Sequence, residues 1–319
     1  MKNEIVTIAD LCVDLLFVGE VKPIYGQVEQ FVSDYTVELG GSTAIFSSQF
    51  TKLGGQIKLI GKVGEDVFGN YLVERLRGLN IPPTYVIKST SEKTAVGLGL
   101  AYHSDRAMLT YLGALTEMSP DELLATGLFD HPQHVHITSY YLLAHLHDFW
   151  KEQVPLLKSK GATISLDTNW SPFGDWHAVH AILPFIDVFI PNEQEALHIS
   201  GQSSVLDAGK WLSNFCGLTV IKCGGDGAVT FEKDKTVTSF DVPAYLKQDL
   251  KIADTTGAGD NFDAGFLKAW LSGNKIKDCV RDGMICGTMS LKQVGGIASQ
   301  PTDLTLIRNK INENKLFGK

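Results

Sequence analysis

The chain has 319 residues, of which 44% are hydrophobic and 20% are charged, and its formal net charge is −8. This composition is typical of a globular protein with a sizeable core, and the acidic balance argues against nucleic acid or an anionic membrane as a partner. The five cysteines form no CxxC pair, which indicates reduced thiols and predicts a cytoplasmic location. Glu4, Asp10 and Asp14 interrupt the N-terminal apolar run, so neither a signal peptide nor a membrane span is expected there.

Short apolar segments alternate with helical patterns, which is typical of a mostly parallel sheet covered by helices. The segments expected to form buried strands are EIVTIADLCV, IKLIGKVG, HVHITS, ATISLD, DVFIPN and LTVIKCGG. The segments expected to form helices include GNYLVERLRGLN, SPDELLATGLF and NEQEALHISG. In the second of these, Ser119 is the predicted N-cap, Pro120 takes the first helical position and Glu122 completes a capping box.

Two segments, about 15–39 and 89–113, break this alternation and contain no convincing helix. In the second, apolar side chains at positions 96, 98, 100 and 102 alternate with glycine and alanine, which is the period of a strand with one apolar face. We expect both segments to form a small separate sheet that acts as a lid. Because its apolar face needs a cover, a homodimer formed through the lid is also expected.

Several common motifs are absent. The sequence has no GxxxxGK[ST] phosphate loop, no GxGxxG after the first strand and no GxSxG elbow. His134 and His136 flank one strand position, and His145 and His147 share the stretch AHLH. No third ligand accompanies either pair, so the sequence does not predict a metal site there.

The stretch ADTTGAGDNFDAGFLKAWLSGN, residues 253–274, places a carboxylate behind a turn of small residues. Phe262, Phe266 and Trp270 repeat every four residues, which predicts a helix that begins near Ala258–Asp260 and ends before Gly273. The first N–H groups of such a helix lack intrahelical partners and attract an anion. From this stretch alone, Asp260 either caps the helix or accepts a proton from a nucleophile that attacks the bound anion.

The stretch DTTGAGDNFDAGF closely resembles the C-terminal signature of the ribokinase-like, or PfkB, carbohydrate kinases. Other motifs of that family have similar stretches here, in the family's order: GGSTAIFSSQFTKLGG followed by GKVGEDVFG, then PNEQEA, then IKCGGDGAV. The resemblance covers most of the chain. It implies a three-layer α/β/α sandwich with a mostly parallel central sheet and a small β-sheet lid, all within a single ribokinase-like domain over residues 1–319.

The resemblance implies roles for residues that match the family motifs. Asp260 resembles the general base that deprotonates a sugar hydroxyl. The N–H groups of Gly257, Ala258 and Gly259 resemble the anion hole that offsets charge on the transferring phosphoryl group. Asp14 and the glycine pair resemble the sugar-binding positions. The residues implied on the substrate side are Asp14, Gly40, Gly41, Ile45 and Tyr140.

On the nucleotide side, the resemblance implies contacts with ATP and Mg²⁺. Asn192 and Glu195 match an Asn-x-x-Glu motif one helical turn apart, with Glu195 near Mg²⁺, directly or through water. The residues implied to bind ATP are Asn192, Lys222, Gly224, Gly225 and Gly227. A potassium site occurs in part of the family, and its matching positions here are Asp254, Thr256, Ser290 and Gly295.

Two positions depart from the family pattern. Ile45 stands where many members have an asparagine that contacts sugar, and Tyr140 falls near another polar sugar contact. Ribose itself is therefore in doubt as the substrate. The sequence predicts an ATP-dependent kinase of a small sugar or sugar derivative. The alternatives are a nucleoside kinase, with Ile45 and Tyr140 shaping a base pocket, and a non-catalytic sugar or nucleotide sensor.

Overall fold

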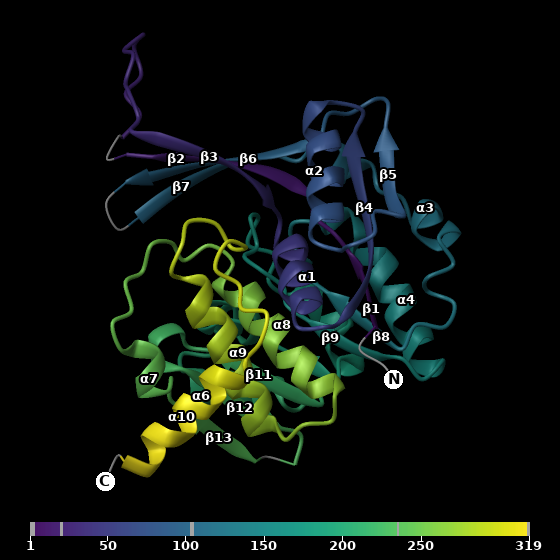
Figure 1. Ribbon diagram of the computed structural model, residues 1–319. Coiled ribbons are helices and arrows are strands. Elements are labelled where there is room, and N and C mark those ends of the chain that lie inside the picture. The colour runs from purple at the N-terminus through teal and green to yellow at the C-terminus, as the bar shows by residue number, and fades with distance from the viewer. Residues whose placement is uncertain (1–3, 20–21, 103–104, 235, 318–319) are drawn as a thin grey trace.

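The computed structural model describes residues 4–19, 22–102, 105–234 and 236–317. Within these residues a large sheet runs through the centre of the molecule in the strand order β13-β12-β11-β10-β9-β8-β1-β4-β5 (Figure 1). Its strands are β1 Glu4–Ile8, β4 Gln56–Gly64, β5 Tyr85–Ser89, β8 His134–Ile137, β9 Thr163–Leu166, β10 Val188–Phe189, β11 Leu218–Lys222, β12 Ala228–Glu232 and β13 Val237–Phe240. Neighbours from β5 through β11 pair in parallel, and β12 and β13 are antiparallel. The mostly parallel sheet predicted from the sequence is confirmed.

Helices cover both faces of this sheet, and each face has its own hydrophobic cluster. One cluster packs α3 Pro120–Ala125, α4 His147–Ser159, α5 Glu193–Ser200 and α6 Val205–Leu212 against the sheet. The other packs α1 Ser42–Lys52, α2 Val67–Gly78, α8 Ala258–Leu271, α9 Ile276–Ser290 and α10 Thr305–Phe317. The side chains of β1 point to the two faces of the sheet in turn: Ile5 belongs to the second cluster, while Val6 and Ile8 belong to the first. The short α7, Ala244–Lys247, lies near α9 and α10.

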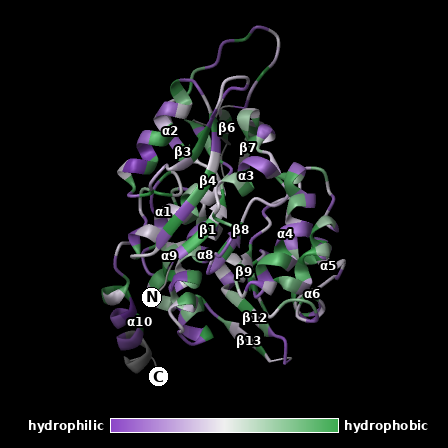
Figure 2. Cartoon of the chain, turned by 90° about the vertical axis from the view of Figure 1, so that its right-hand side faces the viewer, coloured by the Kyte–Doolittle hydropathy of each residue, from purple (hydrophilic) through white to green (hydrophobic). Residues whose placement is uncertain are grey.

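A second sheet with the order β3-β2-β6-β7 lies beside the main body (Figure 1). Its strands are β2 Cys12–Val18, β3 Asp34–Gly40, β6 Ala95–Tyr102 and β7 Asp105–Tyr111. They fall in or next to the two segments expected to form a lid, apart from residues 20–21 and 103–104, which lie outside the described residues. Residues 22–33, before β3, project away from the body as a loop that mixes polar and apolar residues (Figure 2).

The first predicted strand is wrong in one respect. EIVTIADLCV was expected to be continuous, but β1 belongs to the large sheet and β2 to the small one. The chain crosses between the sheets at residues 9–11, where the Asp10 carboxylate accepts hydrogen bonds from the backbone N–H groups of Ser42 and Thr43. Asp14 therefore lies within a strand of the small sheet, not at the end of the first strand of the large one.

Local helix signals agree closely with the structure. Helix α3 begins after Ser119, whose side chain accepts from the N–H of Glu122, while the Glu122 carboxylate accepts from the N–H of Ser119. Among the helices in the described ranges, none is long and apolar enough to cross a membrane.

The histidines His134 and His136 on β8 are buried among hydroxyl groups. Both rings lie within 2.8 Å of Ser165 Oγ, and His134 also lies 2.8 Å from Thr163 Oγ1. Burial lowers the pKa of each histidine to about 3. In the part of the chain that the structure describes, no group of three His, Cys, Asp or Glu side chains is arranged to hold a metal ion.

Because His134 and His136 stay neutral in the folded protein, we expect its stability to decrease in acid. Below about pH 6.5 the unfolded chain protonates both residues and the folded protein does not, so stability falls as pH decreases. We expect a loss of at most about 1.4 kcal/mol per pH unit for each histidine in the free energy of unfolding. Urea denaturation between pH 5 and 7 should show a shallower pH dependence for His134→Gln than for wild type. The exposed His131→Gln is the control, and equal slopes in all three proteins would contradict the prediction.

Candidate active site

Helix α8 begins behind a glycine in the left-handed conformation. Gly257 is the N-cap with φ of 70°, and no side chain caps the helix. A Cβ atom at Gly257 would lie 2.8 Å from Ile45 Cγ2, so both the backbone angle and the packing require glycine. The first turn of α8 therefore has no capping side chain, and its dipole favours a bound anion.

The Asp260 carboxyl group lies in this first turn and lines a cavity of about 500 Å³. It is 8% exposed. Burial, helped by the nearby Asp167 charge, raises the pKa of Asp260 to about 8, and a hydrogen bond with Ser42 acts in the opposite direction. The N-cap of α8 is Gly257 and not Asp260, and the role of Asp260 as a proton acceptor stays a prediction.

The small sheet forms one wall of this cavity. Its contribution is Cys12, Asp14, Gly97, Met108 and Thr110. Asp14 is held between glycines, because Cβ atoms at Gly40 and Gly97 would lie 2.4 Å and 2.7 Å from its carboxylate. Gly41 has φ of 92°, and a Cβ atom there would lie 2.2 Å from the Asp10 carbonyl oxygen. Gly40 and Gly41 thus allow the Asp14 carboxylate and the Asp10 carbonyl to come close to the backbone. Gly41 lines the cavity and Gly40 does not.

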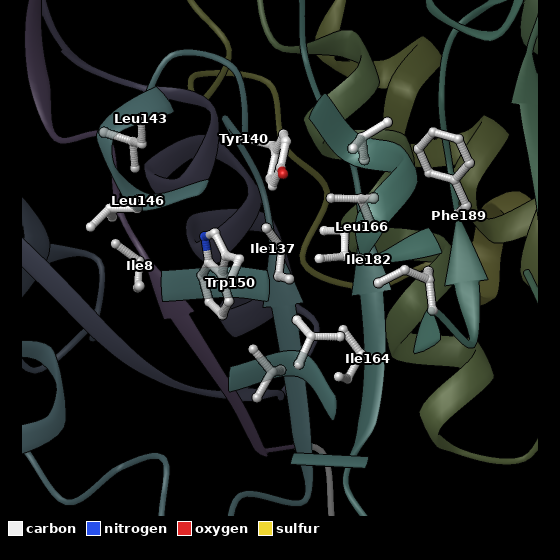
Figure 3. Close-up of a cluster of buried hydrophobic side chains, with 14 of the residues drawn as sticks. Ile8, Ile137, Tyr140, Leu143, Leu146, Trp150, Ile164, Leu166, Ile182 and Phe189 are labelled. Carbon is white, nitrogen blue, oxygen red and sulfur yellow. The ribbon is translucent and has the colours of Figure 1, made fainter. Parts of the chain in front are cut away.

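Ile45 and Tyr140 have different positions. Ile45 is 4% exposed, lines the cavity and packs behind Gly257 and Gly296. Tyr140 is 1% exposed and does not line the cavity. Its ring stacks on His147 and packs among apolar side chains (Figure 3), and its hydroxyl donates to the Ala178 carbonyl. The structure therefore does not support a substrate contact by Tyr140, because the ring is part of the core under β8 and β9.

A second cavity of about 360 Å³ lies on the other side of the α8 N-terminus. Its wall is mostly apolar and includes Val242, Leu250, Ile252, Phe262, Met284 and Leu291. Gly224, Gly225 and Gly227, at the turn after β11, also line it, and their role in ATP binding stays a prediction. The two cavities share Lys222, Gly224, Thr255, Ala258 and Gly259. They therefore meet at the first turn of α8.

Lys222 lies where the cavities meet but is bound to two buried carboxylates. Its Nζ atom is 3.0 Å from Asp167 and 3.1 Å from Asp263. Burial alone would lower the pKa of Lys222, but these two charges raise it above its ordinary value. Burial also acts to raise the pKa of Asp167, but the charge of Lys222 and the hydrogen bonds with Asp263 and Lys222 together outweigh it and hold that pKa below its ordinary value. Lys222 therefore lines both cavities and offsets the negative charge of the buried carboxylates that it contacts.

Asn192 and Glu195 form a capping box at the start of α5. The Asn192 side chain accepts from the N–H of Glu195, and the Glu195 carboxylate accepts from the N–H of Asn192, both at 2.9 Å. Both residues also line the larger cavity. Glu195 is 4% exposed, and burial together with the Asp167 charge raises the pKa of Glu195 to about 7.

Three of the four residues predicted for a potassium site lie together. The Asp254 carboxylate accepts from the N–H and hydroxyl of Thr256 and from the N–H of Gly295. Ser290 is the last residue of α9, and its carbonyl accepts from the Ser299 hydroxyl at 3.0 Å. The carbonyl of the next residue, Leu291, accepts from the N–H of Ala253 at 2.8 Å. The loops before α8 and after α9 are thus joined through Asp254.

Residues 2–303 of the chain match the pfkB family of carbohydrate kinases. The chain belongs to this family. A 2-dehydro-3-deoxygluconokinase of Bacillus subtilis is 26% identical over 292 residues, which cover 87% of this chain and 88% of that protein. The chain is therefore a carbohydrate kinase.

Solved structures agree with the kinase fold. Arabidopsis thaliana ribokinase complexed with ribose and ATP has a TM-score of 0.82 at 21% identity and covers 98% of this chain and 99% of its own. A putative ribokinase II of E. coli, in complex with ATP and Mg²⁺, has a TM-score of 0.82 at 23% identity, with the same coverage. The predicted ribokinase-like fold with a smaller sheet is confirmed.

Sequence reasoning missed three residues of the kinase site. Asp10, Ser42 and Asn169 line the larger cavity. They form one network, in which Asn169 Nδ2 donates to Ser42 Oγ at 2.7 Å and the Ser42 N–H donates to Asp10. The signal for Asp10 was its place directly after a buried parallel strand, where ligands gather. Asn169 follows β9 in the same way, but the contact with Ser42, 127 residues away, has no sequence signal.

Proposed function

We propose that this kinase transfers the γ-phosphoryl group of ATP to a hydroxyl group of a small neutral sugar or sugar derivative. The observation that carries the proposal is the meeting of two cavities at the N-terminus of α8, with Asp260 on the larger one. The apolar cavity suits the base and ribose of ATP, and the larger, more polar cavity suits the acceptor. The phosphates would then lie at the glycine turn between them.

Each group near the turn has a role in this proposal. Asp260 takes the proton of the attacking hydroxyl, because a free hydroxyl is a poor nucleophile. The N–H groups of Gly257, Ala258 and Gly259 offset the charge on the transferring group. Mg²⁺, when bound with ATP, neutralises phosphate charge. Glu195 would address it through water, since its Oε2 atom already accepts from the N–H of Asn192 at the start of α5.

The charges of the acceptor cavity favour a neutral acceptor. Among the described residues that line it, the cationic side chain is Lys222, which is paired with Asp167 and Asp263. Asp10, Asp14 and Glu195 face the same space. Among these described lining residues, a carboxylate or phosphate on the acceptor would find no cationic side chain that is not already paired. Hydroxyl groups, in contrast, can donate to Asp14.

Two further proposals concern the cation and the assembly. We propose that potassium binds between the loops before α8 and after α9, which the hydrogen bond from the Gly295 N–H to Asp254 joins. We also propose a homodimer through the outer face of the small sheet, because Tyr35, Leu109 and Tyr111 there are 62%, 63% and 47% exposed. Sedimentation of a monomer at micromolar concentration would contradict the dimer.

The test is ADP release with Mg-ATP against a panel of neutral sugars, polyols, sugar acids, sugar phosphates and nucleosides, with and without potassium. We expect turnover with a neutral sugar or sugar derivative and rates at least tenfold lower with anionic analogues. Preference for a nucleoside would favour the alternative of a nucleoside kinase. If ATP binds but no acceptor raises ADP release, the proposed acceptor class is wrong.

A further inference from the structure

Two buried amide side chains connect the first turn of α8 to the rest of the kinase. Asn261 directly follows Asp260 and is fully buried. Its Nδ2 donates to the carbonyl oxygens of Gly257 and Gly296, both at 2.8 Å. Its Oδ1 accepts from Gln300 Nε2 at 2.8 Å. Both N–H bonds and the carbonyl oxygen of this amide are therefore in use, which fixes its orientation.

Gln300 continues this network to helix α1. Its Nε2 also donates to the Ile45 carbonyl at 3.0 Å, and its Oε1 accepts from Ser48 Oγ at 2.6 Å. Gln300 is 7% exposed and Ser48 is fully buried. Helix α1 begins at Ser42, which lines the acceptor cavity. The two amides thus join the phosphate side of the site, the segment after α9 and the acceptor side.

The Asn261 side chain is bound to the peptide group between Gly257 and Ala258, which belongs to the proposed anion hole. The Gly257 carbonyl accepts from both the N–H and the Nδ2 of Asn261. Because a trans peptide is planar, its C=O and N–H bonds point in opposite directions. A carbonyl fixed toward Asn261 therefore also fixes the direction of the Ala258 N–H, which donates to the Thr255 carbonyl at 3.3 Å. This sets the backbone at the start of α8, where Ala258 and Gly259 line both cavities.

We propose that Asn261 and Gln300 are positioning residues for phosphoryl transfer: they hold the Gly257 carbonyl and so aim the N–H groups of the glycine turn. This inference rests on the proposed role of that turn as an anion hole. Neither side chain lines either of the two cavities. Their effect is on the orientation of donors that act most strongly on charge developing during transfer.

The chain offers a matched control. Gln49 on α1 is fully buried, and its Nε2 donates to the Pro301 carbonyl at 2.9 Å. It therefore ties the same helix to the same C-terminal segment as Gln300 does, but without a contact to Asn261 or Gly257. Gln300→Met and Gln49→Met remove the same chemical group, and Asn261→Leu provides a second variant in the network.

The first measurement is a comparison of kcat and KM in the three variants, per mole of folded enzyme. We expect kcat to fall about 10- to 100-fold in Gln300→Met and Asn261→Leu, since small misplacements of catalytic groups cost rates of this order. KM for ATP and acceptor should change less than about threefold, because neither cavity loses a contact group. Gln49→Met should lower the melting temperature and leave kcat unchanged. Equal kcat values for Gln300→Met and Gln49→Met would overturn the proposal.

Hydrogen exchange gives a test that does not depend on turnover. Backbone amides in residues 255–262 should exchange faster in Gln300→Met than in Gln49→Met, because only the former releases the Gly257 turn. Unchanged exchange in that segment would overturn the positioning role even for a protein with no identified acceptor. If exchange is faster in Gln300→Met but wild type turns over no acceptor, the positioning of the turn by Gln300 is supported and the proposed function is contradicted.

Discussion

Replacing Asp260 by Asn is expected to lower kcat by about 10²- to 10⁴-fold while ATP affinity changes little. A general base contributes a factor of this size when it is correctly placed, and an asparagine of nearly the same shape cannot take the proton. Steady-state kinetics with the best acceptor of the panel measure the effect. Asp121→Asn, at an exposed carboxylate on α3, is the matched control. A kcat for Asp260→Asn within threefold of wild type would show that another group is the base.

The raised pKa of Asp260 adds two pH predictions. Since the base must be ionised, kcat/KM for the acceptor should rise with pH up to about 8, the pKa that burial gives Asp260. The same pKa means that the folded wild type holds a proton which the unfolded chain releases above about pH 4. Its stability therefore falls as pH rises from about 4 to 8, by at most about 1.4 kcal/mol per pH unit from this group. Asp260→Asn lacks this loss, so it should be more stable than wild type at pH 8 and similar at pH 4.

Much of the fold followed from local patterns. The apolar segments alternating with helices predicted the parallel sheet, and Gly257 and Gly273 marked the two ends of α8 correctly. These signals are local, because a strand, a cap or a positive φ is decided by neighbouring residues. The division of the first strand into β1 and β2 was missed, because its cause is the bond from Asp10 to residues 32 and 33 positions away.

The site was less predictable for the same reason. The sequence identifies Lys222 as a strand-end residue, but its partners Asp167 and Asp263 lie 55 and 41 residues away. Tyr140 lies near a family position that contacts sugar, yet its packing against His147 and the aromatic side chains around it buries its ring. The motif fixes which residues stand at the turn, while the tertiary contacts fix what each one touches.

Replacing Lys222 by Met is expected to lower the free energy of unfolding by about 3–5 kcal/mol at pH 8. Removing one partner of a buried ion pair leaves the other charge without compensation, and Asp167 is 4% exposed. The loss should be smaller at pH 5.5, because Asp167 without Lys222 has a raised pKa and the folded variant takes up a proton as pH falls. Urea denaturation at both pH values measures the difference.

The Lys158–Asp187 pair is the control for this effect. Lys158 Nζ lies 2.7 Å from both carboxylate oxygens of Asp187, but the side chains of Lys158 and Asp187 are 30% and 28% exposed. Solvent can replace such a partner, so Lys158→Met should cost about 1 kcal/mol or less. Adding Asp167→Asn to Lys222→Met should recover part of the lost free energy of unfolding, since it removes the carboxylate that has lost its cationic partner. If the double variant is less stable than Lys222→Met, the lost stability comes from packing of the lysine side chain and not from the uncompensated carboxylate.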